Sequence, residues 1–94
     1  MNELLISARR AGLNHIADTV AEALGITAEV MRDRRRLDRE VVLARRVAAL
    51  VILRRAPSAR LHEVSAAVGY RDRASVDDAR GDREAVQIAE AMAA

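Results

Sequence analysis

The stretch that decides the fold runs from Leu61 to Ala79 and reads LHEVSAAVGYRDRASVDDA. Its first part places Leu61, Val64 and Val68 at the spacing of successive helical turns, so these residues predict a short helix with one apolar face. Gly69 follows directly, and it is expected to end the helix because glycine adopts a positive φ without steric cost.

A second helix is expected after the glycine turn. Asp72 is placed to cap it by accepting backbone N–H bonds from the first turn. Val76 and Ala79 then give this helix an inward face. Helix, glycine turn and helix form a helix-turn-helix, whose second helix enters the major groove of DNA. A simple helical hairpin without a DNA-binding role fits the same pattern.

Composition favours a helical domain. The chain has 94 residues, enough for one domain with a modest core, and it is 51% hydrophobic with a single aromatic residue, Tyr70. A core of Leu, Val, Ile and Ala favours helices over sheets, so we expect an all-α compact bundle of about five to six helices. The chain has no cysteine, and His15 and His62 are well separated, so neither a metal nor a cofactor is expected.

Positive charge is concentrated in one segment. Residues 31–55 hold nine Arg and three acidic residues, a net charge of +6, whereas residues 1–30 and 56–94 carry −2 each. All sixteen basic residues are Arg, which codon usage in a GC-rich genome would explain and which also suits bidentate bonds to phosphate and guanine. Such a local field is typical of a protein with a polyanionic partner, and we expect double-stranded DNA.

No membrane span and no catalytic grouping is predicted. The apolar stretch 41–53 is too short for a bilayer and is interrupted by Arg45 and Arg46. No signal peptide follows Met1. Neither a glycine-rich phosphate loop nor a catalytic spacing of Ser, His and Asp is visible. We therefore expect a cytoplasmic, nucleoid-associated protein that is not an enzyme.

The N-terminal part predicts three short helices. The first spans Glu3 to Ala11 and ends at Gly12. The second follows an Asn14 cap and is closed by Gly25. The third is a turn of helix capped by Thr27.

The longest predicted helix is Glu40 to Arg55, which contains no Gly or Pro and is apolar nearly all round, so burial on several sides is expected. Taken alone, Val51-Ile52-Leu53 would also fit a strand. Pro57 ends this helix, and Ser58 is a candidate cap for the next. Gly81 is expected to kink or fray the second helix of the helix-turn-helix, and an Ala-rich tail, residues 84–94, either packs back or docks on another protein.

Two groups of arginines are candidates for backbone contacts. The run RDRRRLDR, Arg32 to Arg39, is either a solvated helix end or a clamp on phosphates that reaches into a groove. Three consecutive Arg cannot all find acidic partners nearby, which favours the clamp. Arg45 and Arg46 interrupt the long helix where no helix dipole explains them, so phosphate contacts are expected there too.

Base contacts are expected at the start of the second helix of the helix-turn-helix. Arg71 and Arg73 can bond guanine, Ser75 can bond base or phosphate, and Ala74 can touch a thymine methyl. The Asp77-Asp78 pair should face away from phosphate or read a cytosine amino group. The candidate DNA-binding residues are Arg34, Arg35, Arg36, Arg39, Arg45, Arg46, Arg71, Asp72, Arg73, Ala74 and Ser75.

At these residues the chain resembles the C-terminal DNA-binding domain of the bacterial replication initiator DnaA. The family signature G-x-R-D-H-T-T-V-x-H-A is matched by GYRDRASVDDA at residues 69–79. Upstream, REVVLARR at residues 39–46 is similar to R-E-I-V-L-A-R-Q, and LHEV at residues 61–64 is similar to L-P-E-I. The likeness extends back to Ile16 through the phrase TVAEALGI at residues 19–26.

The resemblance implies an all-α, Trp-repressor-like helix-turn-helix fold over residues 13–80, in a single domain of residues 1–94. Residues 1–12 would then form an N-terminal helix and residues 84–94 a helical tail. The resemblance places residues 71–75 where the family reads its DNA box. It also implies an Arg of the basic run in the minor groove and a phosphate or base contact by Arg45.

Several positions depart from the family pattern. Arg73 stands where the family has a base-reading His, Ala74 where it has Thr, and Asp78 where it has a second His. The family's minor-groove Arg falls near Leu37, so Arg36 or Arg39 would have to substitute for it. The DNA site is therefore expected to differ from the initiator's box. No ATPase motif accompanies the domain, so ATP hydrolysis is not expected.

A transcription regulator, most simply an activator, is the function that the resemblance favours. Similar domains occur in activators of gene transfer agents, which work with a sigma-like partner. We therefore expect a protein partner, such as a sigma-like factor or RNA polymerase, or a homodimer. Two alternatives stay open: a replication regulator that competes at initiator boxes, and a helical adaptor whose arginines bind an acidic protein.

Overall fold

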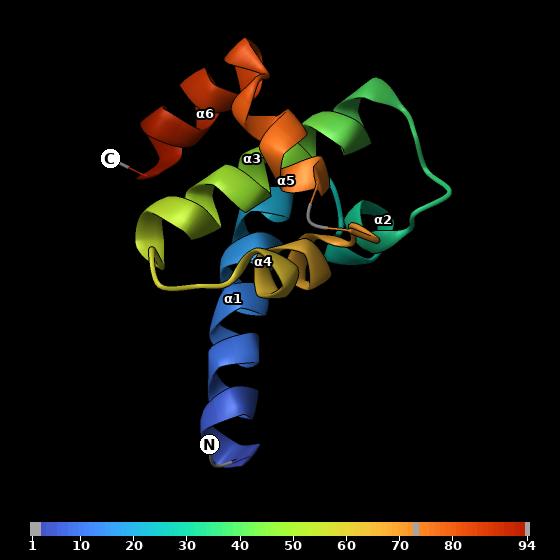
Figure 1. Ribbon diagram of the computed structural model, residues 1–94. Helices are drawn as coiled ribbons and strands as arrows, with labels where there is room; N and C mark the ends of the chain where they lie inside the picture. Colours follow the sequence, from blue (N-terminus) through green and yellow to red (C-terminus); the bar gives the residue numbers. More distant parts are fainter. Residues whose placement is uncertain (1–2, 73, 94) are drawn as a thin grey trace.

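The computed structural model describes residues 3–72 and 74–93, and over these residues it contains six helices and no strand (Figure 1). The all-α prediction is confirmed, and the run 51–53 is helical. The helices are α1 (Glu3–Ala23), α2 (Ala28–Arg32), α3 (Arg39–Arg55), α4 (Leu61–Val68), α5 (Ala74–Arg80) and α6 (Arg83–Ala93). Within the described residues, none of these helices is long and apolar enough to cross a membrane.

Helix α3 forms the centre of the bundle, and all five other helices pack against it (Figure 1). Its sequence accounts for this position, because apolar residues occur nearly all round it. Val47, Ala48 and Ile52 are completely buried. Small Ala side chains along α3 let neighbouring helices approach closely. The core is built from Val, Ala, Leu and Ile, as the composition predicts, together with the fully buried Met31.

The expected break at Gly12 is wrong, because α1 runs without interruption from Glu3 to Ala23. Asn14 consequently lies inside the helix and caps nothing, and residues 1–12 do not form a helix of their own. Leu13, Ala17 and Val20, which follow Gly12, form one continuous buried stripe. Burying that stripe offsets the helical cost of one glycine, about 1 kcal/mol. The N-terminal half of α1 projects past the other helices (Figure 1).

The predicted boundaries around α2 are confirmed, and one after α3 is not. Gly25 adopts a positive φ of 78° beyond the end of α1, and Thr27 Oγ1 accepts the N–H of Val30 at 3.1 Å. Helix α3 ends before Pro57, as expected, but Ser58 does not cap α4. Arg60 holds the cap position instead, because the Glu63 carboxylate accepts its N–H at 3.1 Å.

The C-terminal helix packs back onto the bundle. Helix α5 ends at Arg80, just before Gly81, and Asp82 starts α6 by accepting the N–H of Ala85 at 3.1 Å. Ala85 and Ala89 are buried against the core. Gly81 therefore marks the end of α5, and of the two alternatives for the tail, packing against α3 is the observed one.

Candidate nucleic-acid interface

The helix-turn-helix predicted from the sequence is present as α4, a short turn and α5. Gly69 ends α4 in the left-handed conformation, with φ of 95°, and its N–H donates to Ser65 O at 3.0 Å. Asp72 Oδ1 accepts the N–H of Ser75, in the first turn of α5, at 3.1 Å. The buried Ser65 hydroxyl also donates to Asp72 O at 3.0 Å, so the turn is fixed from both helices.

Helix α5 is oriented by its two buried residues. Val76 and Ala79 are completely buried and belong to the core cluster, as the sequence predicts. Because side chains on a helix repeat every three to four positions, the remaining faces are turned outward. Ala74 and Asp78 are exposed and Ser75 is half-buried. The first turn of α5 is therefore accessible to a large ligand.

Beside this turn, residues 33–38 form the connection between α2 and α3, which we call the arginine loop. The loop arches away from the helices (Figure 1). A local turn shapes it, because Asp33 Oδ1 accepts the N–H of Arg35 at 3.1 Å and Asp33 O accepts the N–H of Arg36 at 3.0 Å. The loop consequently has a defined backbone conformation without being helical.

Two of the three consecutive arginines have acidic partners inside the loop, whereas Arg34 donates to backbone carbonyls, so the expectation that the three would not all find acidic partners is confirmed. Arg35 donates to both carboxylate oxygens of Asp33, at 3.1 and 3.2 Å, and Arg36 to both of Asp38, at 3.1 and 2.7 Å. These hydrogen bonds lower the pKa of both carboxyls. The Arg35 side chain is 91% exposed. Solvent screens such exposed pairs and leaves them weak, so a phosphate can replace the carboxylate.

Arg34 connects the arginine loop to the helix-turn-helix. Its Nε donates to Gly69 O at 3.2 Å and its Nη2 to Tyr70 O at 3.4 Å. Arg32, the last residue of α2, joins α2 to two other helices. Its Nε donates to Ala67 O of α4 at 2.8 Å, and its Nη2 donates to an Asp18 oxygen of α1 at 2.5 Å. The loop and the turn are therefore joined into one surface.

The structure corrects the expected phosphate contact of Arg45. Only 4% of this residue is exposed, and its Nε donates to Met31 O at 2.6 Å while its Nη2 donates to Asp33 O. Burial lowers the pKa of Arg45. The guanidinium therefore holds the base of the arginine loop, because it donates to the backbone carbonyls of Met31 and Asp33.

Arg46, the next residue on α3, is more accessible. Its Nη1 pairs with Asp82 at 2.8 Å, and 36% of its side chain is exposed. This hydrogen bond lowers the pKa of Asp82. Arg46 therefore keeps a positive edge at the surface while it ties α3 to the start of α6.

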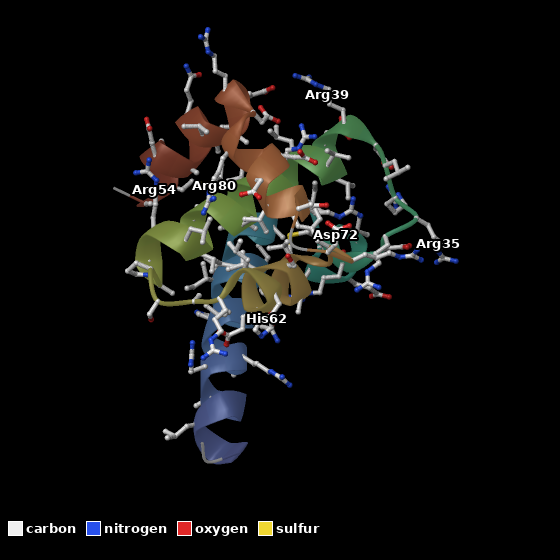
Figure 2. All side chains as sticks on the ribbon, in the orientation of Figure 1. Arg35, Arg39, Arg54, His62, Asp72 and Arg80 are labelled. Atoms are coloured by element: carbon white, nitrogen blue, oxygen red, sulfur yellow. The ribbon has the colours of Figure 1, made fainter. Side chains whose placement is uncertain are left out.

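A cleft of about 520 Å³ lies between the arginine loop and the helix-turn-helix. Four elements contribute to it: the loop, α3, the turn and α5. Its lining residues are Arg34, Arg35, Leu37, Val42, Arg45, Arg46, Gly69, Tyr70, Arg71, Ser75 and Asp78. Figure 2 shows Arg35 and Asp72 on the side of the molecule where the loop extends, with Arg54 on the far side. The cleft brings together most of the arginines that the sequence singled out.

Some predicted site residues lie elsewhere. Arg36 does not line the cleft, and Arg39 reaches α6, where it pairs with Glu84 at 2.8 Å. The Asp72 carboxylate is engaged as a cap. Arg73 lies outside the described residues, so its predicted base contact stays a prediction.

The two adjacent acids of α5, Asp77 and Asp78, lie in different surroundings. Asp77 pairs with Arg80 at 2.9 Å, away from the cleft. Asp78 lines the cleft, contrary to the expectation that it would face away, which leaves the cytosine-reading alternative for it. Asp78 is the one acidic side chain among the residues lining the cleft, so the positive character of the surface is retained.

Sequence reasoning did not include Leu37, Val42 and Tyr70, which also line the cleft. A signal existed for two of them: Leu37 is the one apolar residue in the basic run, and Tyr70 is the only aromatic residue and follows the glycine of the turn. Burial raises the pKa of Tyr70 to about 12, so its hydroxyl stays protonated beside the arginines.

Comparisons of the chain with protein families, with curated proteins and with solved structures gave no match. The chemistry of the cleft therefore follows from the residues that line it. It offers guanidinium groups, the hydroxyls of Tyr70 and Ser75 and one carboxylate around a concave, partly apolar floor. Such a set binds anions by charge and hydrogen bonding.

Proposed function

We propose that this chain is a sequence-specific, double-stranded DNA-binding transcription regulator. Helix α5 lies in the major groove, and the arginine loop holds the adjacent backbone or minor groove. The observation that carries the proposal is the cleft, in which Arg34 and Arg35 of the loop and Arg71 and Ser75 of the helix-turn-helix line one surface.

Physical chemistry supports a nucleic acid as the ligand. Arg35 and Arg36 of the loop are exposed and pair with carboxylates inside the loop, so they can exchange those partners for phosphates without disturbing the core. Helix α5 presents its first turn outward, which is the part of a recognition helix that meets base edges. The resemblance to the DnaA DNA-binding domain supports the same assignment, and the changes at Arg73, Ala74 and Asp78 favour a different DNA sequence.

The narrower part of the proposal is activation together with a protein partner, such as a sigma-like factor or RNA polymerase, or as a homodimer. It rests on the resemblance and on the small size of one helix-turn-helix, which usually needs a second contact for affinity. The nucleoid of the cytoplasm is the site of action that this function requires.

Salt-dependent binding to duplex DNA tests the proposal. Arg35→Ala should reduce the slope of log K against log[salt] by about 0.9, because one phosphate contact is lost. Arg54→Ala is the matched control: Arg54 is also exposed and ion-paired, with Glu90 at 3.2 Å, but it lies at the far end of α3 and should leave the slope unchanged. Absence of binding at low salt would overturn the proposal and favour the adaptor alternative.

Sequence preference is tested separately with duplexes selected from a random pool. Arg73→Ala and Ser75→Ala should each relax the preference at one or two base pairs, by roughly 1–3 kcal/mol. Unchanged preference in both variants would contradict the role of α5. Selection of the initiator's own box by the unmodified chain would favour the replication regulator over the transcription regulator.

A further inference from the structure

Leu37 is exposed in a way that the fold does not explain. Its exposed fraction is 74%, and the one other large hydrophobic residue exposed among the described residues is Leu5, at 60%. A leucine gains about 1.5–3 kcal/mol when it is buried, so a partner that covers Leu37 would gain that contact. The arginine loop therefore presents an apolar side chain to solvent as well as its charges.

The structure holds Leu37 outward. At the base of the loop, the buried Arg45 guanidinium binds Asp33 O, and Arg34 fastens the loop to Gly69 O at 3.2 Å. Arg36 and Asp38, the two neighbours of Leu37 in the sequence, are bound to each other by two hydrogen bonds. These contacts keep the loop from folding its leucine back onto the bundle.

Leu37 also lies between two hollows that each contain arginines. On one side is the cleft of about 520 Å³, with Arg35 and Arg71 among its lining residues. On the other side is a smaller hollow of about 290 Å³, which Leu37 lines together with Arg39 and Arg46 and with their acidic partners Glu84 and Asp82. Leu37 therefore lies between Arg35 in the cleft and Arg39 in the smaller hollow.

We propose that Leu37 is an apolar wedge that enters the DNA minor groove and partly unstacks one base step. The inference rests on the proposed function and adds a specificity-determining contact to it. Proteins that bind the minor groove insert apolar side chains in this way, with basic residues on the flanking phosphates. Because pyrimidine–purine steps unstack most easily, Leu37 gives the chain a preference for such a step at a position that α5 does not read.

The experiment uses the full chain and a duplex that it selects from a random pool, with 2-aminopurine placed in turn at the positions of the selected site. The unmodified chain should raise the fluorescence at one step. Leu37→Ala should abolish that rise and weaken binding about tenfold, because the buried apolar contact is lost. Leu37→Met, which keeps a large apolar side chain, should restore both.

Leu5→Ala is the matched control, since it removes the same atoms from an exposed leucine on the projecting end of α1. Equal affinity and equal fluorescence in Leu37→Ala and the unmodified chain would overturn the wedge and leave DNA binding intact. Absence of DNA binding by the unmodified chain would overturn the wedge and the proposed function together. Binding with no fluorescence rise at any position would overturn the wedge alone.

Discussion

Gly69 lies so close to Arg32 that a Cβ at position 69 would stand 2.6 Å from the Cα of Arg32. This contact joins the end of α4 to the end of α2, which is the point where the arginine loop begins. Gly69 therefore does two things at once: its φ of 95° turns the chain toward α5, and its missing side chain lets the loop approach the turn.

Gly69→Ala should lower the free energy of unfolding by about 2–4 kcal/mol, because the left-handed conformation and the overlap with backbone both act against a Cβ. Two other glycines separate these causes. Gly25 has a φ of 78° with open space around it, so Gly25→Ala should cost about 1–2 kcal/mol from the backbone alone.

Gly12 is helical and open, so Gly12→Ala should stabilise the chain by about 0.5–1 kcal/mol. Chemical denaturation of the three variants measures the series. Equal losses in Gly25→Ala and Gly69→Ala would contradict the close contact between α2 and the turn.

Arg45→Met should destabilise the chain by about 2–4 kcal/mol, because the carbonyls of Met31 and Asp33 lose a charged donor and the methionine supplies none. The loss should persist in high salt, since this guanidinium is buried and poorly screened. Arg54→Met, at an exposed ion pair, should change stability by less than about 1 kcal/mol. Thermal unfolding at low and high salt compares the two, and an equally small effect in both would contradict the structural role of Arg45.

The helix-turn-helix was predictable from sequence because its signals are local. A glycine at a positive φ and an aspartate cap act within a few residues of their own position, and both predictions, Gly69 and Asp72, are confirmed. Gly12 looked like the same kind of signal, but the helix continues through it, because the buried stripe that begins at Leu13, directly after the glycine, decides the outcome. A glycine in the sequence therefore predicts the end of a helix only where no buried apolar face continues the helix beyond it.

The roles of individual arginines were less predictable. Arg45 and Arg46 are adjacent in the sequence, and the sequence predicts the same role for both. Arg45 is nevertheless buried and bound to backbone carbonyls, whereas Arg46 is paired with an acid at the surface. Adjacent positions on a helix point about 100° apart, so only the packing around α3 assigns their roles. The partner of Arg39 is equally non-local, because Glu84 lies on a helix whose docking the sequence left open.

Tyr70 should titrate at an unusually high pH. Its pKa is raised from the ordinary 10.0 to about 12, mainly by burial, so the native chain keeps the phenol proton after the unfolded chain has lost it. The contribution of Tyr70 to stability is therefore complete below pH 10 and is lost as the pH rises toward 12. Tyr70 is the only tyrosine, so the near-ultraviolet absorbance of tyrosinate reports this one group. Tyr70→Phe should remove this part of the alkaline loss, and an ordinary titration at 10.0 would contradict the burial of the hydroxyl.

Helix α6 should limit how strongly the chain binds DNA, because its acids hold arginines of α3. Glu84 pairs with Arg39 at 2.8 Å beside Leu37, whereas Glu90 pairs with Arg54 at 3.2 Å at the opposite end. Glu84→Gln should free Arg39 for a phosphate and steepen the slope of log K against log[salt] by up to about 0.9. Glu90→Gln changes the net charge equally but far from the cleft, so it should leave the slope unchanged.

Both pairs are exposed, so neither variant should lose more than about 1 kcal/mol of stability. A similar rise in affinity for both would mean that net charge, and not the position of α6 beside the arginine loop, sets the strength of binding.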